Sequence, residues 1–145
     1  MIFQARPWGI TALSIFFLAG AVISFVASIS LLAPDSFLRP MWRLNPRAQE
    51  NLSMLGFWAV VLLGTVSLLC AAAAIGLWRT ARWGYWLAIT LIVVNLIGDV
   101  TNVLLGTEPR AIVGVPIAGL ILAYLLSKRV RLFFSRADRS HLTDR

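Results

Sequence analysis

The amino-acid sequence predicts an all-α fold, a four-transmembrane-helix antiparallel bundle of an integral membrane protein. Of its 145 residues, 59% are hydrophobic and only 13% are charged, whereas about a quarter of a typical soluble domain is charged. Four apolar stretches reach the roughly 20 residues that a membrane helix needs. A short basic and aromatic segment separates the second stretch from the third. We therefore expect a single membrane domain that comprises residues 1–145.

The first predicted helix covers residues 8–33 and follows Arg6-Pro7. Its apolar run is longer than the 7 to 15 residues of a signal-peptide core, so we expect a helix that is retained. Three small residues, Gly20, Ser24 and Ser28, recur at every fourth position. Because small side chains let a second helix approach closely, this face is predicted to pack against a helix, within the bundle rather than as a dedicated dimer contact.

Residues 35–44 mix apolar, aromatic and basic side chains, which is typical of an interfacial segment on the membrane surface. The second helix is predicted over residues 46–78, with Asn45 as its cap and Pro46 in its first turn. A helix of that length would extend about 50 Å, well beyond a hydrocarbon core of about 30 Å. Its first turns are therefore expected to project from the bilayer.

The third and fourth helices are predicted over residues 83–105 and 108–127. The fourth carries a small pair, Gly114 and Ala118, that is predicted to pack against a neighbouring helix. Residues 128–145 form a basic cytoplasmic tail, which is expected to begin as a continuation of the fourth helix.

Residues 78–86 contain two arginines, three tryptophans and one tyrosine. Aromatic rings favour the headgroup layer and arginine is retained on the cytoplasmic side, so this segment indicates a tight cytoplasmic hairpin. On this topology nine lysines and arginines lie on one side and four on the other. The positive-inside rule then places both termini in the cytoplasm, at what we expect is a bacterial inner (plasma) membrane. The residues predicted to meet lipid headgroups are Arg79, Arg82, Lys128, Arg129 and Arg131.

Three polar residues of the third helix, Asn95, Asp99 and Asn102, follow the spacing i, i+4 and i+7 and so share one face. Asp99 is the only acid inside a predicted span. A charge in hydrocarbon is costly, so such a residue faces the bundle interior, a partner or water. These residues are candidates for substrate or ion binding or for contact with a partner. In the structural alternative, Asp99 is hydrated near the outer interface or pairs with Arg110 or another outer arginine, and the two asparagines tie helices together.

The sequence contains few residues that could carry out catalysis. The single cysteine, Cys70, permits neither an intrachain disulfide nor a CxxC pair, and the single histidine, His141, lies in the tail. We therefore expect no catalytic residues, no metal site and no cofactor, and predict that the chain is not an enzyme. The net charge of +7 is concentrated at helix ends and in the tail, which indicates contact with membrane lipids and not with nucleic acid.

The opening Arg6-Pro7-Trp8-Gly9-Ile10 and the stretch 76–89 resemble a broad group of small, uncharacterised bacterial inner-membrane proteins with four helices. The resemblance implies the architecture. In size and helix count the chain also looks like the small multidrug resistance exporters, but its first helix lacks the glutamate on which those exporters rely. Relatives of vitamin K epoxide reductase have a comparable bundle and need paired cysteines, which this chain lacks.

The leading functional hypothesis is a non-enzymatic accessory or scaffold subunit that packs against a larger membrane complex or against its own copies. The first alternative is a small ion- or proton-coupled transporter in which Asp99 is the coupling residue. The second is a lipid-interacting protein that uses Arg39, Arg43 and Arg47 on one side of the membrane and residues 128–136 on the other.

Overall fold

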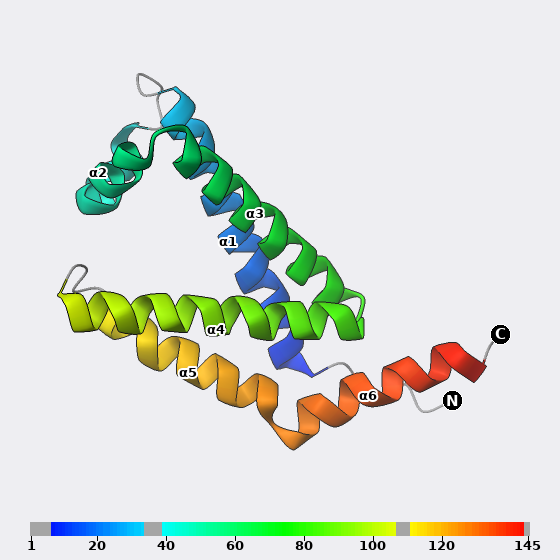
Figure 1. Ribbon diagram of the computed structural model, residues 1–145. Helices are drawn as coiled ribbons and strands as arrows, with labels where there is room; N and C mark the ends of the chain where they lie inside the picture. Colours follow the sequence, from blue (N-terminus) through cyan, green and yellow to red (C-terminus); the bar gives the residue numbers. More distant parts are fainter. Residues whose placement is uncertain (1–6, 34–38, 107–110, 144–145) are drawn as a thin grey trace. The chain divides into compact units, whose positions relative to one another are not determined.

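The computed structural model describes residues 7–33, 39–106 and 111–143 (Figure 1). Within these ranges the chain is helical and contains no strand, which confirms the all-α class. The α-helices are α1 (Trp8–Leu32), α2 (Pro46–Leu55), α3 (Phe57–Trp78), α4 (Arg82–Leu105), α5 (Ala111–Leu126) and α6 (Lys128–Thr143). A short 3-10 helix, η1 (Arg39–Leu44), precedes α2. The predicted start of the fourth helix at residue 108 lies outside the described residues.

Three helices, α1, α3 and α4, are long and apolar enough to cross a membrane. They contain 25, 22 and 24 residues, so each exceeds a hydrocarbon core of about 30 Å at 1.5 Å per residue. The pair formed by α5 and the start of α6 passes the same test together but is bent by 51°. The described chain thus has three candidate spans, or four if the bent pair is one span, as expected of a membrane protein.

The chain divides into two compact units. The first, called here the α1–α3 unit, comprises Ile15–Ala72; the second, the α4–α6 unit, comprises Met1–Ser14 and Ala73–Arg145. Both α1 and α3 are divided between the two units.

Serine hydroxyls join the two long helices of the α1–α3 unit. Ser28 Oγ donates to the carbonyl of Val60 at 3.1 Å, and Ser67 Oγ donates to the carbonyl of Ala21 at 2.8 Å. A Cβ built on Gly20 would lie 3.8 Å from the Cys70 sulfur. The face of α1 that carries Gly20 and Ser28 therefore lies against α3.

The prediction of one helix over residues 46–78 is wrong. The chain breaks at Gly56, whose φ of 54° and ψ of −127° are readily adopted only by glycine. Figure 1 shows α2 turning away from the axis of α3 at this point. Asn45 does cap α2 as expected, because its side chain accepts a hydrogen bond from the amide of Ala48 at 3.2 Å. The break separates a short polar helix from a long apolar one.

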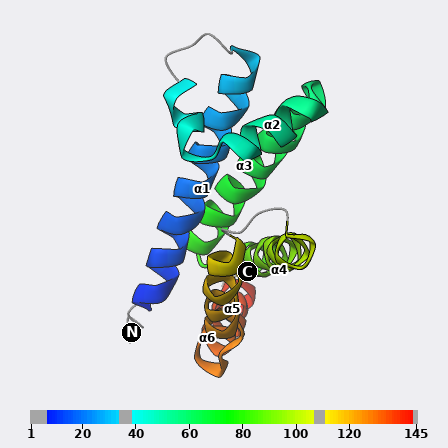
Figure 2. The same cartoon turned by 90° about the vertical axis from the view of Figure 1, so that its left-hand side faces the viewer.

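In the α4–α6 unit, α4 and α5 lie side by side, and α6 contacts both (Figures 1 and 2). Tyr85 of α4 fixes this arrangement. Its hydroxyl donates to the carbonyl of Leu125 at 3.0 Å, and its ring stacks on Phe134 of α6 with centroids 4.9 Å apart. The tail is therefore not a continuation of the fourth helix: the helix is interrupted at Ser127, and Phe134 packs back against α4.

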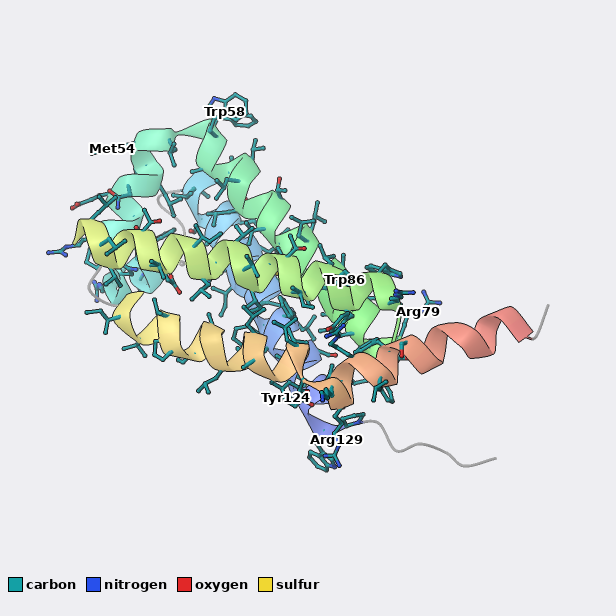
Figure 3. All side chains as sticks on the ribbon, turned by 60° about the horizontal axis from the view of Figure 1, so that its bottom comes forward. Met54, Trp58, Arg79, Trp86, Tyr124 and Arg129 are labelled. Atoms are coloured by element: carbon teal, nitrogen blue, oxygen red, sulfur yellow. The ribbon has the colours of Figure 1, made fainter. Side chains whose placement is uncertain are left out.

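The turn between α3 and α4 brings two glycines into backbone contact. A Cβ added to Gly76 would lie 2.5 Å from the Cα of Gly84, and one added to Gly84 would overlap the backbone of Gly76. The amide of Ala81 closes the turn by donating to the carbonyl of Gly76 at 2.9 Å. Arg79 and Trp86 lie exposed at this end of the unit (Figure 3).

Replacing Gly84 by alanine is expected to destabilise the protein by about 1 to 3 kcal/mol, because the new methyl group would push two helix backbones apart. Gly119→Ala, on α5 of the same unit, is the control, since nothing lies within 4 Å of its added Cβ. That variant should remain within about 1 kcal/mol of the parent protein. Unfolding of both variants in mixed micelles measures the difference, and equal losses would contradict the close contact.

Candidate functional site

A hydrogen bond joins two members of the predicted polar face of α4. Asn95 Nδ2 donates to Asp99 Oδ2 at 3.1 Å. The Asn95 side chain is exposed, whereas Asp99 and Asn102 are half-buried. The structure thus brings Asn95 and Asp99 together, and Asn102 follows on the next turn of the same helix. Arg110, the predicted partner of Asp99, lies outside the described residues.

The two bonded side chains lie in the central part of α4. At 1.5 Å per residue, Asn95 is about 2 Å and Asp99 about 8 Å along the axis from the middle of this helix. If α4 is centred in a hydrocarbon core about 30 Å thick, both residues lie inside that core. On that placement the polar face would lie at the depth of the hydrocarbon core within this candidate span.

A glycine of α5 makes room for the carboxylate. A Cβ added to Gly114 would overlap Asp99 Oδ2 and lie 3.0 Å from the Asp99 carboxyl carbon. Ala118, one turn further along α5, is buried. The pair Gly114 and Ala118 thus lies on the part of α5 that is close to α4, and Asp99 fills the space above the glycine.

One carboxylate hydrogen-bonded to one amide has limited chemistry. It can accept a further hydrogen bond, exchange a proton or attract a cation. Within the described residues, no group of three or more histidine, cysteine, aspartate or glutamate side chains is placed to hold a metal ion. Hydrogen bonding, proton exchange and attraction of a cation are the properties that this pair of side chains has by itself.

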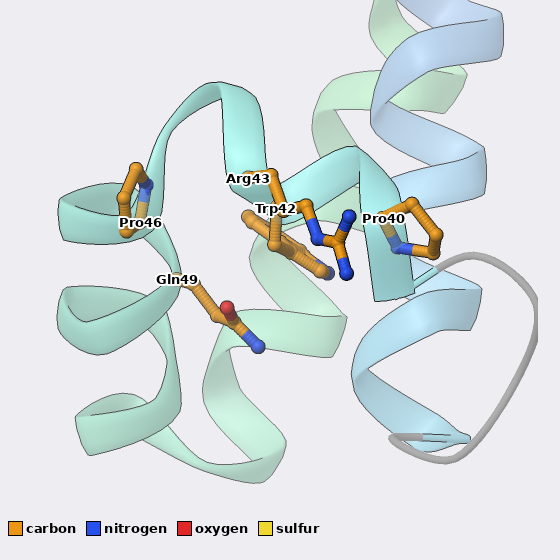
Figure 4. Close-up of a pocket in the computed structure, with 5 residues that line it drawn as sticks. All are labelled: Pro40, Trp42, Arg43, Pro46 and Gln49. Carbon is orange, nitrogen blue, oxygen red and sulfur yellow. The ribbon is translucent and has the colours of Figure 1, made fainter.

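A cavity of about 420 Å³ lies between η1 and α2 in the α1–α3 unit (Figure 4). Its lining consists of Pro40, Trp42, Arg43, Pro46 and Gln49. The sequence predicts only a surface segment in this region, and the cavity is not among its predictions. The available signal was a tryptophan and an arginine between two prolines, whose rings restrict the backbone on both sides.

One hydrogen bond joins the tryptophan of this cavity to α1, and a second orients the serine that accepts it. Trp42 Nε1 donates to Ser30 Oγ at 2.9 Å, and Ser30 Oγ donates to the carbonyl of Ala27 at 2.8 Å. The Trp42 side chain is only 8% exposed. The wall that Trp42 contributes is therefore fixed relative to α1.

The basic residues predicted to meet headgroups are exposed and belong to the α4–α6 unit. Arg79 and Arg82 lie at the turn between α3 and α4, and Arg129 lies on the first turn of α6. Lys128 and Arg131 also line a second hollow of about 290 Å³. Tyr85 places the start of α4 beside the end of α5, so these cations gather at one end of the unit.

Comparison of the chain with protein-family models, with curated proteins and with solved structures finds no match. The resemblance to small four-helix bacterial membrane proteins stays a prediction.

The contact between Asp99 and Gly114 predicts a coupled pair of substitutions. Gly114→Ala should cost about 1 to 3 kcal/mol, because the methyl group displaces the carboxylate and its bond to Asn95. In an Asp99→Ala background most of this cost should disappear, giving a coupling energy of about 0.5 to 3 kcal/mol. Gly119→Ala is the control, because its added Cβ has no atom within 4 Å. Additive effects of Gly114→Ala and Asp99→Ala in a double-mutant cycle would refute the contact.

Proposed function

We propose that the chain is a non-enzymatic accessory or scaffold subunit of a membrane complex, and that a partner helix covers the α4 face that carries Asn95. The observation that carries the proposal is the exposure of the Asn95 amide near the middle of a candidate membrane span. The partner is either a larger membrane complex or a second copy of this chain.

Polar groups in hydrocarbon need partners. An aspartate at the centre of a membrane helix costs about 2.5 to 3.5 kcal/mol on insertion scales, and an amide without hydrogen bonds is also costly. The bond between Asn95 and Asp99 uses one of the two amide hydrogens of Asn95. The side-chain carbonyl and the second hydrogen of Asn95 are the groups that a partner would satisfy.

The described contacts of the α4–α6 unit leave space for a partner helix next to Asn95. Gly98 lies three residues further along α4, on an adjoining part of the same surface. No atom lies within 4 Å of a Cβ built on Gly98. Gly20 and Gly114, by contrast, lie against Cys70 and Asp99 of their own units. Gly98 therefore offers a close approach that the described contacts leave open.

An ion- or proton-coupled transporter is the second candidate, favoured by the hydrogen bond between an amide and the one acid of the span. In that function Asp99 would exchange a proton, with Asn95 and Asn102 as ligands. Asp99→Asn separates the two proposals, because it retains a polar side chain of the same shape but cannot ionise. A transporter would lose coupled flux in reconstituted vesicles, whereas a scaffold would retain its complex.

Asn95→Leu is expected to weaken the complex by about 3- to 30-fold, the range that corresponds to the loss of an interhelical hydrogen bond in a membrane. Thr101→Val is the matched control on α4, because the Thr101 hydroxyl donates to the carbonyl of Ile97 of its own helix at 2.8 Å. The measurement is the native mass of the tagged protein extracted from its own membranes in mild detergent.

A bulky residue at the open glycine provides an independent check. Gly98→Leu should dissociate the complex and change the stability of the separated chain little, since no described atom lies within 4 Å of the Cβ that it adds. A parent protein that runs as a bare monomer, or a complex that survives both Asn95→Leu and Gly98→Leu, would contradict the proposal.

A further inference from the structure

We infer that the cavity between η1 and α2 binds the phosphate-bearing headgroup of an anionic phospholipid. The cavity belongs to the α1–α3 unit, so the inference is independent of the proposed partner contact on α4. It rests on the chemistry of the lining, on the way the lining is held and on the position of the cavity between two candidate spans.

The size of the cavity suits a lipid headgroup. Its volume of about 420 Å³ falls in the range of roughly 300 to 1,000 Å³ that is typical of small-molecule sites. The wall combines an aromatic face and two proline rings with two polar side chains. Figure 4 shows Arg43 and Gln49 extending from η1 and α2 toward the same space, with Trp42 between them. Such a lining can hold an ionic group and an apolar body at once.

Arg43 selects for an anion. A guanidinium presents its donors in a planar fork that matches the oxygens of a phosphate. Within the described residues no carboxylate forms an ion pair with Arg43, and the side chain is exposed. Gln49 adds an amide donor across the cavity. As far as the described residues go, both polar side chains of the lining thus keep donors for phosphate oxygens.

The lining is held in place before any ligand binds. The indole of Trp42 is fixed by its bond to Ser30, and the start of α2 is fixed by the Asn45 cap. Pro40 and Pro46 restrict the backbone at both edges of the segment. A site that is already ordered loses less conformational entropy on binding, which favours affinity.

The surroundings indicate a lipid and not a soluble anion. The cavity lies in the connection between α1 and α3, two helices long and apolar enough to span a membrane. Where α2 ends and α3 begins, Met54, Phe57 and Trp58 are 85%, 71% and 73% exposed, and Figure 3 shows Met54 and Trp58 at the outside of this connection. Large exposed apolar and aromatic side chains of this kind insert at the membrane interface. A cavity at that level faces lipid headgroups.

The test compares two exposed arginines, one that lines the cavity and one that does not. Arg43 lines it, whereas Arg47, in the first turn of α2, is exposed and does not. The full chain is reconstituted in nanodiscs of phosphatidylcholine with a minor fraction of phosphatidylglycerol, and retained lipid is counted by native mass spectrometry. Arg43→Gln should reduce the retention of phosphatidylglycerol about tenfold or more, and Arg47→Gln about twofold or less.

Two further arms complete the experiment. Gln49→Leu, which keeps the size of the side chain and removes its donor, should also lower retention, with the melting temperature unchanged. Glycerol phosphate is added as a soluble competitor and should not displace the lipid. Equal losses for Arg43→Gln and Arg47→Gln would reduce the effect to general surface charge and overturn the inference. Displacement of the lipid by glycerol phosphate would overturn the assignment to a lipid.

Discussion

The constraint on which the rest of the structure depends is that polar groups inside a bilayer must find hydrogen-bond partners, because hydrocarbon offers none. The two serines that join α1 and α3 satisfy it by donating to carbonyls of the opposite helix. Tyr85 satisfies it in the same way across α4 and α5. In each case the polar group also ties two helices together. The same hydrogen bonds thus satisfy the polar groups and hold the helices together.

Close approach of the backbones is the second requirement, since lipid tails provide no hydrophobic force that drives one helix against another. Glycines supply it at two places in the α4–α6 unit. Gly76 and Gly84, on either side of the turn, let the backbones of α3 and α4 come into contact. Gly114 leaves the volume that the Asp99 carboxylate occupies. The polar face of α4 therefore depends on the absence of a side chain in α5.

The sequence predicts the helices well because a run of apolar residues has few other stable forms in a membrane. The first and third predicted helices agree with α1 and α4 to within one residue.

The break at Gly56 was missed, because one glycine inside a helical pattern is tolerated unless tertiary contacts favour a positive φ. The bend before α6 was missed for a related reason: it depends on the contact of Phe134 with Tyr85, which are far apart in the sequence. The Trp42 cavity likewise depends on how η1 and α2 pack. The grouping of Asn95 with Asp99 was predictable, since helical periodicity alone sets it.

Exposed hydroxyls and the exposed amide of α4 meet the bilayer in different ways. Thr90 and Thr101 donate to carbonyls of their own helix four residues earlier, so each presents its methyl group and little unmet polarity. Asn95 has a planar amide with two donors and an acceptor carbonyl, and its bond to Asp99 uses one donor. A hydroxyl can be hidden from lipid by its own helix, but this amide cannot. Because exposing this amide to hydrocarbon is costly, a covering helix that supplies complementary polar groups is favoured. The residue that is unfavourable in an isolated chain would then form a specific interhelical hydrogen bond in a complex.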